Sequence, residues 1–157
     1  MAIREIVKRD EESILRKKCR KVEKFDDKLA MIIDDMIDTV KDADGLGLAA
    51  PQIGILRQII VIDADEEMLE IINPEIINEE GEQINVEGCL SCPDVWGYVK
   101  RPETVTIRAY DRKGNQYEMT GKDLLARAFC HEIDHLNGVL FVDKIVEYYY
   151  PEENTEE

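Results

Sequence analysis

Apolar side chains recur at three- and four-residue steps between Asp26 and Asp42, and mostly acidic side chains fill the other positions. In a helix this spacing places the apolar side chains on one face, so the segment is predicted to be an amphipathic helix packed on a core. Asp26 or Asp27 is suited to cap its first turn. The helix is expected to end before Gly45.

Beyond this helix the chain changes to short runs rich in branched residues, which are typical of strands. We expect strands in four runs: 57–63 (buried on both faces), 69–78 (two short strands interrupted at Pro74), 99–110 and 116–120. The Arg-Lys-Gly-Asn sequence at 112–115 predicts a turn that joins the runs 99–110 and 116–120 into a hairpin.

A helical pattern returns from Lys122 to Asn137. The following Gly138 is expected to end that helix, because glycine readily adopts the left-handed C′ conformation. Residues 139–142 predict one more short strand. A helix, several strands and a second helix, without repeats or linkers, indicate an α+β fold.

Composition and charge exclude some functions but identify none. The chain has 157 residues, a formal net charge of −15 and 44% hydrophobic residues, which suits one domain with a core. This acidity argues against DNA binding. The charge is uneven: residues 1–24 hold nine Lys/Arg and five acids, whereas residues 145–157 hold five Glu and no base. We expect one domain over 1–146 and a short acidic tail over 147–157.

The expected compartment is the cytoplasm. No apolar run approaches the ~18 residues that span a bilayer, and the N-terminus lacks the apolar core of a signal peptide. Without a secretion signal, the four cysteines are expected to be thiols, of which one or more can bind metal.

The only two histidines, His131 and His135, are four residues apart in the second predicted helix. This spacing puts both imidazoles on one face, one turn apart, where they can bind the same ion. Glu132 lies about 100° round from His131, so it flanks the ion and can serve as a general acid/base. The alternative is two surface histidines that share this spacing by chance.

Two histidines do not complete a catalytic metal site, which usually has three protein ligands. No third histidine exists, so the third ligand must be a carboxylate or a thiolate. Cys89 is the best thiolate candidate, because the preceding Gly88 permits close backbone approach to a ligand. Cys92 forms a Cys-x-x-Cys pair with Cys89, which leaves open redox chemistry or a structural zinc site that uses both cysteines and both histidines.

A third segment, residues 45–52, combines two glycines and two alanines before Gln52. It lacks the Lys-Ser/Thr of a phosphate-binding loop. An ordinary helix-to-strand loop explains it equally well, unless it lies beside a metal site. There the Gln52 amide could stabilise a developing oxyanion.

Together, these three segments resemble the peptide deformylase family. Its signatures are a Gly-rich loop ending in Ala-Ala-x-Gln, a Glu-Gly-Cys-Leu-Ser segment and a helical His-Glu-x-x-His, and all three are intact and in order. The resemblance runs from Ile3 to Lys144. It implies antiparallel or mixed sheets packed around a central metal-binding helix, with a long amphipathic N-terminal helix.

The resemblance implies that Cys89, His131 and His135 bind a divalent metal. This would be Fe²⁺ in the physiological enzyme, and Zn²⁺, Ni²⁺ or Co²⁺ could replace it. Metal-bound water would attack the formyl carbon of the N-terminal formyl-methionine of a new polypeptide, releasing formate.

The resemblance also implies roles for residues around the metal. Glu132 would be the general acid/base, and the Gln52 side chain and Leu90 N–H would stabilise the oxyanion. Glu87 and Arg101 would brace the cysteine segment. The alternative for that pair is an exposed ion pair worth less than about 1 kcal/mol.

Substrate-binding residues follow from the same resemblance. The backbone around Leu46, Gly47 and Gly88 would pair with an extended peptide. Leu124 and Ala128 share the helical face of His131 and would line an apolar pocket for methionine. Arg127 is less expected there, and its stem could line the pocket while its charged end reaches water.

The C-terminus departs from many family members, which continue with a long, often basic helix. Here an acidic tail follows, and a tail of this charge is not expected to dock on ribosomal RNA. Ribosome contact therefore remains open. Two competing functions also stay open: a metalloprotease whose third ligand is not Cys89, and a structural zinc module that unfolds on chelation.

Overall fold

The computed structural model describes residues 2–8, 14–64 and 67–150. Its helical segments are α1 (Asp27–Asp42), the 3-10 helix η2 (Ala50–Ile53), α2 (Leu124–Leu136) and the 3-10 helix η3 (Phe141–Asp143). Its strands are β1 (Gly47–Ala49), β2 (Ile59–Ala64), β3 (Glu67–Glu80), β4 (Gln83–Cys89), β5 (Cys92–Arg101), β6 (Thr104–Tyr110), β7 (Gln116–Lys122) and β8 (Ile145–Tyr148).

The strands form two sheets. One has five strands in the order β1-β2-β3-β6-β7, and the other has three in the order β4-β5-β8. All neighbouring strands are antiparallel. The predicted α+β class is therefore confirmed, and of the two predicted sheet types the antiparallel one is correct. β1 and β4 each lie at a sheet edge, which leaves one side of each strand available for pairing.

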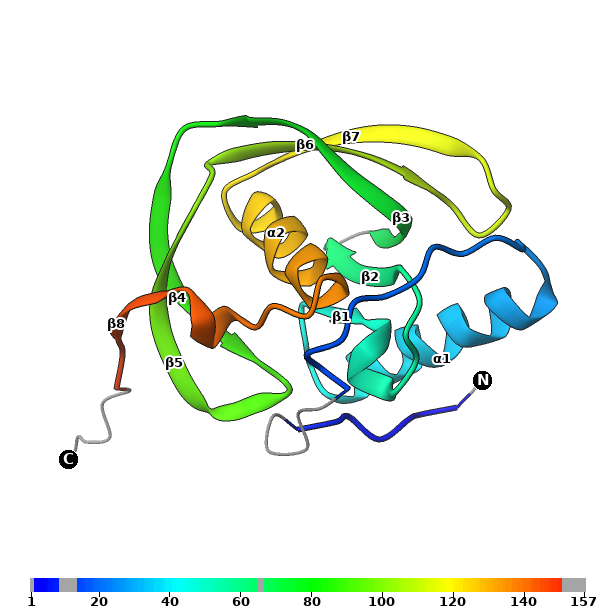
Figure 1. Ribbon diagram of the computed structural model, residues 1–157, viewed down its shortest axis with the longest axis horizontal. Coiled ribbons are helices and arrows are strands. Elements are labelled where there is room, and N and C mark those ends of the chain that lie inside the picture. The colour runs from blue at the N-terminus through cyan, green and yellow to red at the C-terminus, as the bar shows by residue number, and fades with distance from the viewer. Residues whose placement is uncertain (1, 9–13, 65–66, 151–157) are drawn as a thin grey trace.

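Helix α2 runs through the middle of the molecule in Figure 1, with β6 and β7 above it. It contacts β1, β2, β5, β6 and β7, because its apolar side chains belong to the core between the helix and the larger sheet. Phe129 is the largest of these side chains, and it is 1% exposed. Gly138 follows the helix with φ of 76°, as predicted for a C′ glycine.

Helix α1 packs against β1 and β2 on a second core cluster. Asp26 caps it: the side chain accepts a hydrogen bond of 3.0 Å from the backbone N–H of Leu29. Its buried face carries Ile33, Met36 and Val40, each 0% exposed. The helix ends before Gly45, as the sequence predicts.

Pro74 does not divide residues 69–78 into two strands, so that prediction is wrong. β3 continues through it because the pairing with β6 skips from Ile72 to Glu75. Asn73 has φ of 52° at this irregularity. The missing N–H of proline therefore falls where no ladder bond is required.

Two other strand predictions need correction. Residues 99–110 form parts of two strands, since β5 ends before Pro102 and β6 begins at Thr104. Residues 139–142 are not a strand, because η3 begins at Phe141 and the strand β8 comes later. β8 runs past residue 147, the predicted start of the acidic tail, and residues 151–157 of that tail lie outside the described residues.

Within the described ranges, no helix is both long and apolar enough to cross a membrane.

Two glycines with positive φ allow a test of backbone packing. A Cβ at Gly138 would lie 2.4 Å from the carbonyl oxygen of Arg16, whereas a Cβ at Gly54 (φ 83°) would meet nothing within 4 Å. Gly54→Ala should cost about 1 kcal/mol of unfolding free energy from left-handed strain alone. Gly138→Ala should cost about 1–3 kcal/mol more, because backbone must move. Urea denaturation measures both, and equal losses would show that the close approach has no effect.

Candidate metal centre and active-site cavity

Cys89, His131 and His135 form one group, as the sequence predicts. One potential ligand atom from each lies within 4.8 Å of the other two, and no second such group occurs among the described residues. The Cys89 Sγ is 3.4 Å from His135 Nε2. The histidines come from adjacent turns of α2, and the cysteine comes from the end of β4.

Cys92 is not part of this group. It begins β5, is 1% exposed and packs with Val99 and Phe141. The group therefore does not support a structural site that uses both cysteines and both histidines.

Glu87 fixes the orientation of His131. Its Oε1 is 2.9 Å from His131 Nδ1, so the imidazole donates from Nδ1 and keeps the lone pair of Nε2 for another partner. This carboxylate–histidine arrangement commonly supports metal-binding histidines. The ring of His131 also stacks on Phe141, with 5.7 Å between ring centroids.

The same carboxylate pairs with two buried arginines. Arg101 donates two hydrogen bonds of 2.9 Å to Glu87, and Arg127 donates one more. Burial opposes ionisation of Glu87, but the bonds from Arg101 and His131 outweigh it and hold its pKa well below the usual range. The predicted Glu87–Arg101 pair is therefore a buried ion pair, not an exposed one.

The prediction that the charged end of Arg127 reaches water is wrong. The side chain is 6% exposed, and its guanidinium bonds to Glu87 and to the Val99 carbonyl, the latter at 3.0 Å. The sequence contained a signal: Arg127 is the only arginine in the predicted helix of residues 122–137, and it lies one turn before His131. Arg127 thereby ties α2 to the smaller sheet.

Glu132 lies beside the metal-ligand group. It is 5% exposed, and its Oε1 has no hydrogen-bond partner among the described residues. Burial raises its pKa to about 7, and the nearby negative charge of Glu87 adds to the effect. A carboxyl group with a pKa near neutrality can both accept and donate a proton.

The metal-ligand group fits a divalent cation. A hydrogen bond that the Cys89 thiol donates to Cys92, burial and the charge of Glu132 all raise the pKa of the Cys89 thiol, and burial lowers the pKa of His135. His135 is therefore neutral, which is the form that binds metals. A bound cation would favour the thiolate form of Cys89, because a thiol that coordinates a metal is deprotonated. Its positive charge would also compensate the charge of that thiolate. One sulfur and two imidazole nitrogens suit zinc or iron.

Gln52 connects the Gly-rich loop to the cysteine hairpin. Its Oε1 accepts a 3.0 Å bond from the Ala49 N–H, and its Nε2 donates to Ser91 Oγ at 3.1 Å and lies 3.7 Å from Cys89 Sγ. The side chain is 1% exposed. The amide group is therefore held in one position beside the metal-ligand group. Sequence reasoning missed Ser91, although it lies within the quoted Glu-Gly-Cys-Leu-Ser segment.

A cavity of about 500 Å³ opens next to this group. Its lining includes all of the predicted substrate-binding, oxyanion and acid/base residues: Leu46, Gly47, Gln52, Gly88, Leu90, Leu124, Ala128 and Glu132. Cys89 and His131 also line it, whereas His135 does not and is 1% exposed.

Trp96 also lines the cavity, and no sequence pattern predicted it. A Cβ at Gly88 would lie 2.2 Å from its ring, so the indole covers the glycine backbone. The residue remains 40% exposed. The signal was the only tryptophan in the chain, seven residues after Cys89.

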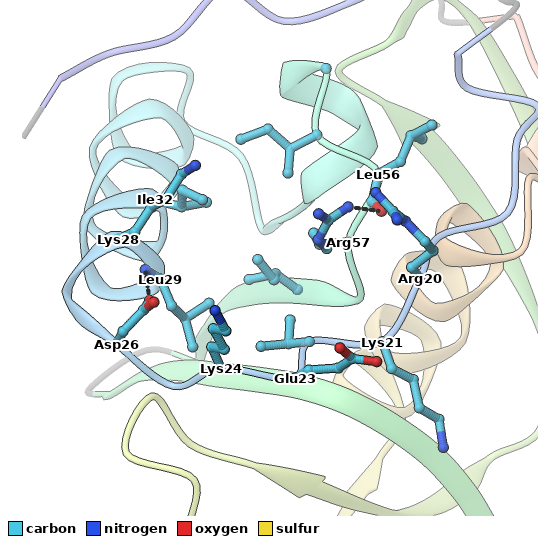
Figure 2. A pocket seen from close by; sticks show the side chains of 14 residues that line it. Arg20, Lys21, Glu23, Lys24, Asp26, Lys28, Leu29, Ile32, Leu56 and Arg57 are labelled. Carbon is cyan, nitrogen blue, oxygen red and sulfur yellow. Dashed lines mark hydrogen bonds between the residues drawn. The ribbon is translucent and has the colours of Figure 1, made fainter.

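A larger cleft, about 830 Å³, lies between the start of α1 and residues 54–59 (Figure 2). Its lining contains five basic side chains, from Arg20, Lys21, Lys24, Lys28 and Arg57, but no cysteine or histidine. None of the predicted site residues lines it. The chemistry therefore points to the smaller cavity.

Comparisons with known proteins give matches over most of the chain. The polypeptide deformylase family matches residues 3–149. Two peptide deformylases are similar in sequence, those of Caldicellulosiruptor bescii (53% identical, covering 98% of this chain and 92% of the relative) and Alkaliphilus metalliredigens (56%, 93% and 99%).

Two solved structures are also similar. One is a peptide deformylase from Legionella pneumophila, with a TM-score of 0.88 and 49% identity over 92% of this chain and 86% of the other. The second is a peptide deformylase from Synechococcus elongatus in complex with actinonin, with a TM-score of 0.83 and 43% identity over 91% and 77%.

The buried carboxylate can be tested by removal. Glu87→Ala should lower the unfolding free energy by about 3–5 kcal/mol, because it leaves Arg127 buried without a carboxylate partner and Arg101 with only Asp134. The matched control is Glu118→Ala, which removes a pair with Arg108 that is 52% exposed on the Glu side. That change should cost less than about 1 kcal/mol. Chemical denaturation compares them, and similar losses would contradict a structural role for Glu87.

Proposed function

The chain belongs to the polypeptide deformylase family of enzymes, and on this premise we propose that it removes the N-formyl group from the formyl-methionine of newly made polypeptides and releases formate. One observation supports this most directly: the group of Cys89, His131 and His135 adjoins Glu132 at the wall of a mostly apolar cavity. A protease with another third ligand, or a structural zinc site with Cys92, fits this arrangement less well.

Peptide deformylases use a divalent metal, and here Cys89, His131 and His135 would hold it. We propose Fe²⁺ as the physiological ion, with Zn²⁺, Ni²⁺ or Co²⁺ able to replace it. When bound, the ion acts as a Lewis acid and lowers the pKa of the water that it binds. Glu87 and the buried arginines would keep His131 oriented throughout.

Glu132 is the proposed general acid/base. It would take a proton from the attacking water and return it to the leaving amine. Its unpartnered Oε1 is available for this, because no other described residue bonds to it. Burial excludes bulk water from the carboxyl group, so the proton stays with the reacting groups.

Gln52 and the backbone N–H of Leu90 would donate to the oxygen of the formyl group as negative charge develops there. The bonds to Ala49 and Ser91 support this, since they hold the Gln52 amide in place before substrate arrives. A donor fixed in advance needs little reorganisation during the reaction.

The substrate would bind as an extended strand between two sheet edges. Gly47 on β1 and Gly88 on β4 both line the cavity, and both strands are at the edges of their sheets. The backbone groups on the unpaired sides of these edge strands suit β-strand addition, and the backbone of Leu46, whose carbonyl accepts from the Asp63 N–H, would adjoin them. The methionine side chain would enter between Leu124 and Ala128, which α2 presents to the same cavity.

The remaining parts of the proposal concern the chain as a whole. Residues 1–146 would form one catalytic domain, with an acidic tail over 147–157 whose first two residues complete β8. The enzyme would act in the cytoplasm on nascent peptides. Residues 145–157, with five Glu and no base, would not themselves dock on ribosomal RNA.

Glu132→Gln tests the acid/base role. The variant should bind metal and fold normally but release formate from formyl-Met-Ala-Ser at least about 100-fold more slowly, the usual minimum for losing such a group. Glu118→Gln on the exposed face of β7 is the matched control and should keep full activity. Assays should be anaerobic on iron-loaded protein. Undiminished formate release by Glu132→Gln would exclude the proposed role.

Metal removal separates a catalytic from a structural ion. Dialysis against a chelator should abolish formate release while the circular dichroism spectrum stays native, because three packed core clusters do not depend on the ion. Added Fe²⁺ should restore activity. The melting temperature should fall, but only by the amount of stabilisation that binding of the ion gave to the native state. Unfolding on chelation would instead favour the structural zinc module.

A further inference from the structure

Cys89 and Cys92 face each other across the turn between β4 and β5. They are register partners, and the two residues between them form the turn. Directly opposite residues of antiparallel strands have Cα atoms about 4.5–5.5 Å apart, which lies within the range of disulfides, about 4.4–6.8 Å. We infer that this pair is a site of oxidative modification, at which a hydroperoxide converts the two thiols into an intramolecular disulfide.

The two sulfurs differ in access, which assigns their roles. Cys89 lines the cavity, whereas Cys92 does not line it and is 1% exposed. The register pairing places the two side chains opposite each other at the turn. A small oxidant entering the cavity therefore meets Cys89 first, and Cys92 is positioned to resolve the product.

The other two cysteines are poor competitors. Cys19 and Cys130 are 8% and 6% exposed, and neither lines the cavity. A small oxidant in the cavity therefore reaches neither of them directly.

The proposed reaction has two balanced steps. The Cys89 sulfur attacks one oxygen of hydrogen peroxide, the O–O bond breaks, and the thiol becomes a sulfenic acid with release of one water. The Cys92 sulfur then attacks the sulfenic sulfur, the S–O bond breaks, and a second water leaves with the Cys92 proton. Overall, two thiols lose two electrons to one peroxide, giving one disulfide and two waters.

This modification has a consequence that rests on the proposed function. A disulfide sulfur is not the anionic ligand that the metal-ligand group requires, so oxidation should release the ion and stop formate production. Thiol reductants reverse a disulfide, whereas they do not reverse sulfinic or sulfonic acid. Cys92 would therefore protect Cys89 from permanent loss.

The test uses the full chain loaded with zinc, which has no redox chemistry of its own. After treatment with hydrogen peroxide and alkylation, peptide mass mapping should show that the peptide containing Cys89 and Cys92 has lost two hydrogen atoms. Dithiothreitol should reverse the change. Addition of two or three oxygens to Cys89, without the hydrogen loss, would overturn the proposal.

Two matched variants control the experiment. Cys92→Ala should show no hydrogen loss and should gain oxygen irreversibly, and Cys92→Ser replaces it if the alanine variant does not fold. Cys19→Ala should behave as wild type, and loss of the disulfide in that variant would count against the Cys89–Cys92 pair.

Zinc release, followed with a chromogenic chelator, separates this proposal from the proposed function. A disulfide that forms while zinc stays bound would support the modification site and exclude Cys89 as a ligand. Zinc release with over-oxidised Cys89 would support the ligand and exclude the disulfide.

Discussion

The arrangement of the candidate site depends on one buried carboxylate. Glu87 lies near the end of β4, accepts bonds from Arg101 on β5 and Arg127 on α2, and orients His131 one helical turn later. Two guanidinium groups in the protein interior would be costly without this partner. The same charge therefore joins the smaller sheet to the helix and sets which imidazole nitrogen faces the cavity. Arg101 extends the network by bonding to Asp134 at 2.7 Å.

Around this network, three separate parts of the chain meet at the cavity. α2 contributes two histidines and Glu132 to the site, the β4–β5 hairpin contributes Cys89, and η2 contributes Gln52. Each part is rigid for its own reason: packing against the larger sheet, strand pairing, and the bonds between Gln52, Ala49 and Ser91. Sheet edges β1 and β4 border the same space, so backbone groups suited to a peptide lie beside side chains suited to hydrolysis.

The sequence predicted the parts of the site that depend on local spacing or on family motifs. The histidines lie one turn apart because of helical periodicity, and the α1 cap is a local hydrogen bond. Partners distant in sequence were harder to predict. Arg127 was expected to reach water because a guanidinium group is costly to bury. In the structure the carboxylate of Glu87, forty residues earlier in the chain, compensates that charge in the interior. Likewise, Pro74 predicted a strand break from its own chemistry, whereas the pairing with β6 accommodates it. Trp96 carries no motif, and only the packing of its ring on Gly88 places it at the cavity.

The position of Trp96 has a practical consequence. It is the only tryptophan in the chain, and its ring is partly exposed at the wall of the cavity. Indole emission responds to the polarity around the ring, and no second indole contributes a background signal. Occupation of the cavity by a peptide or an inhibitor replaces water at that ring with apolar atoms. The protein therefore carries a built-in fluorescent reporter, which allows binding to be followed without a label and without turnover.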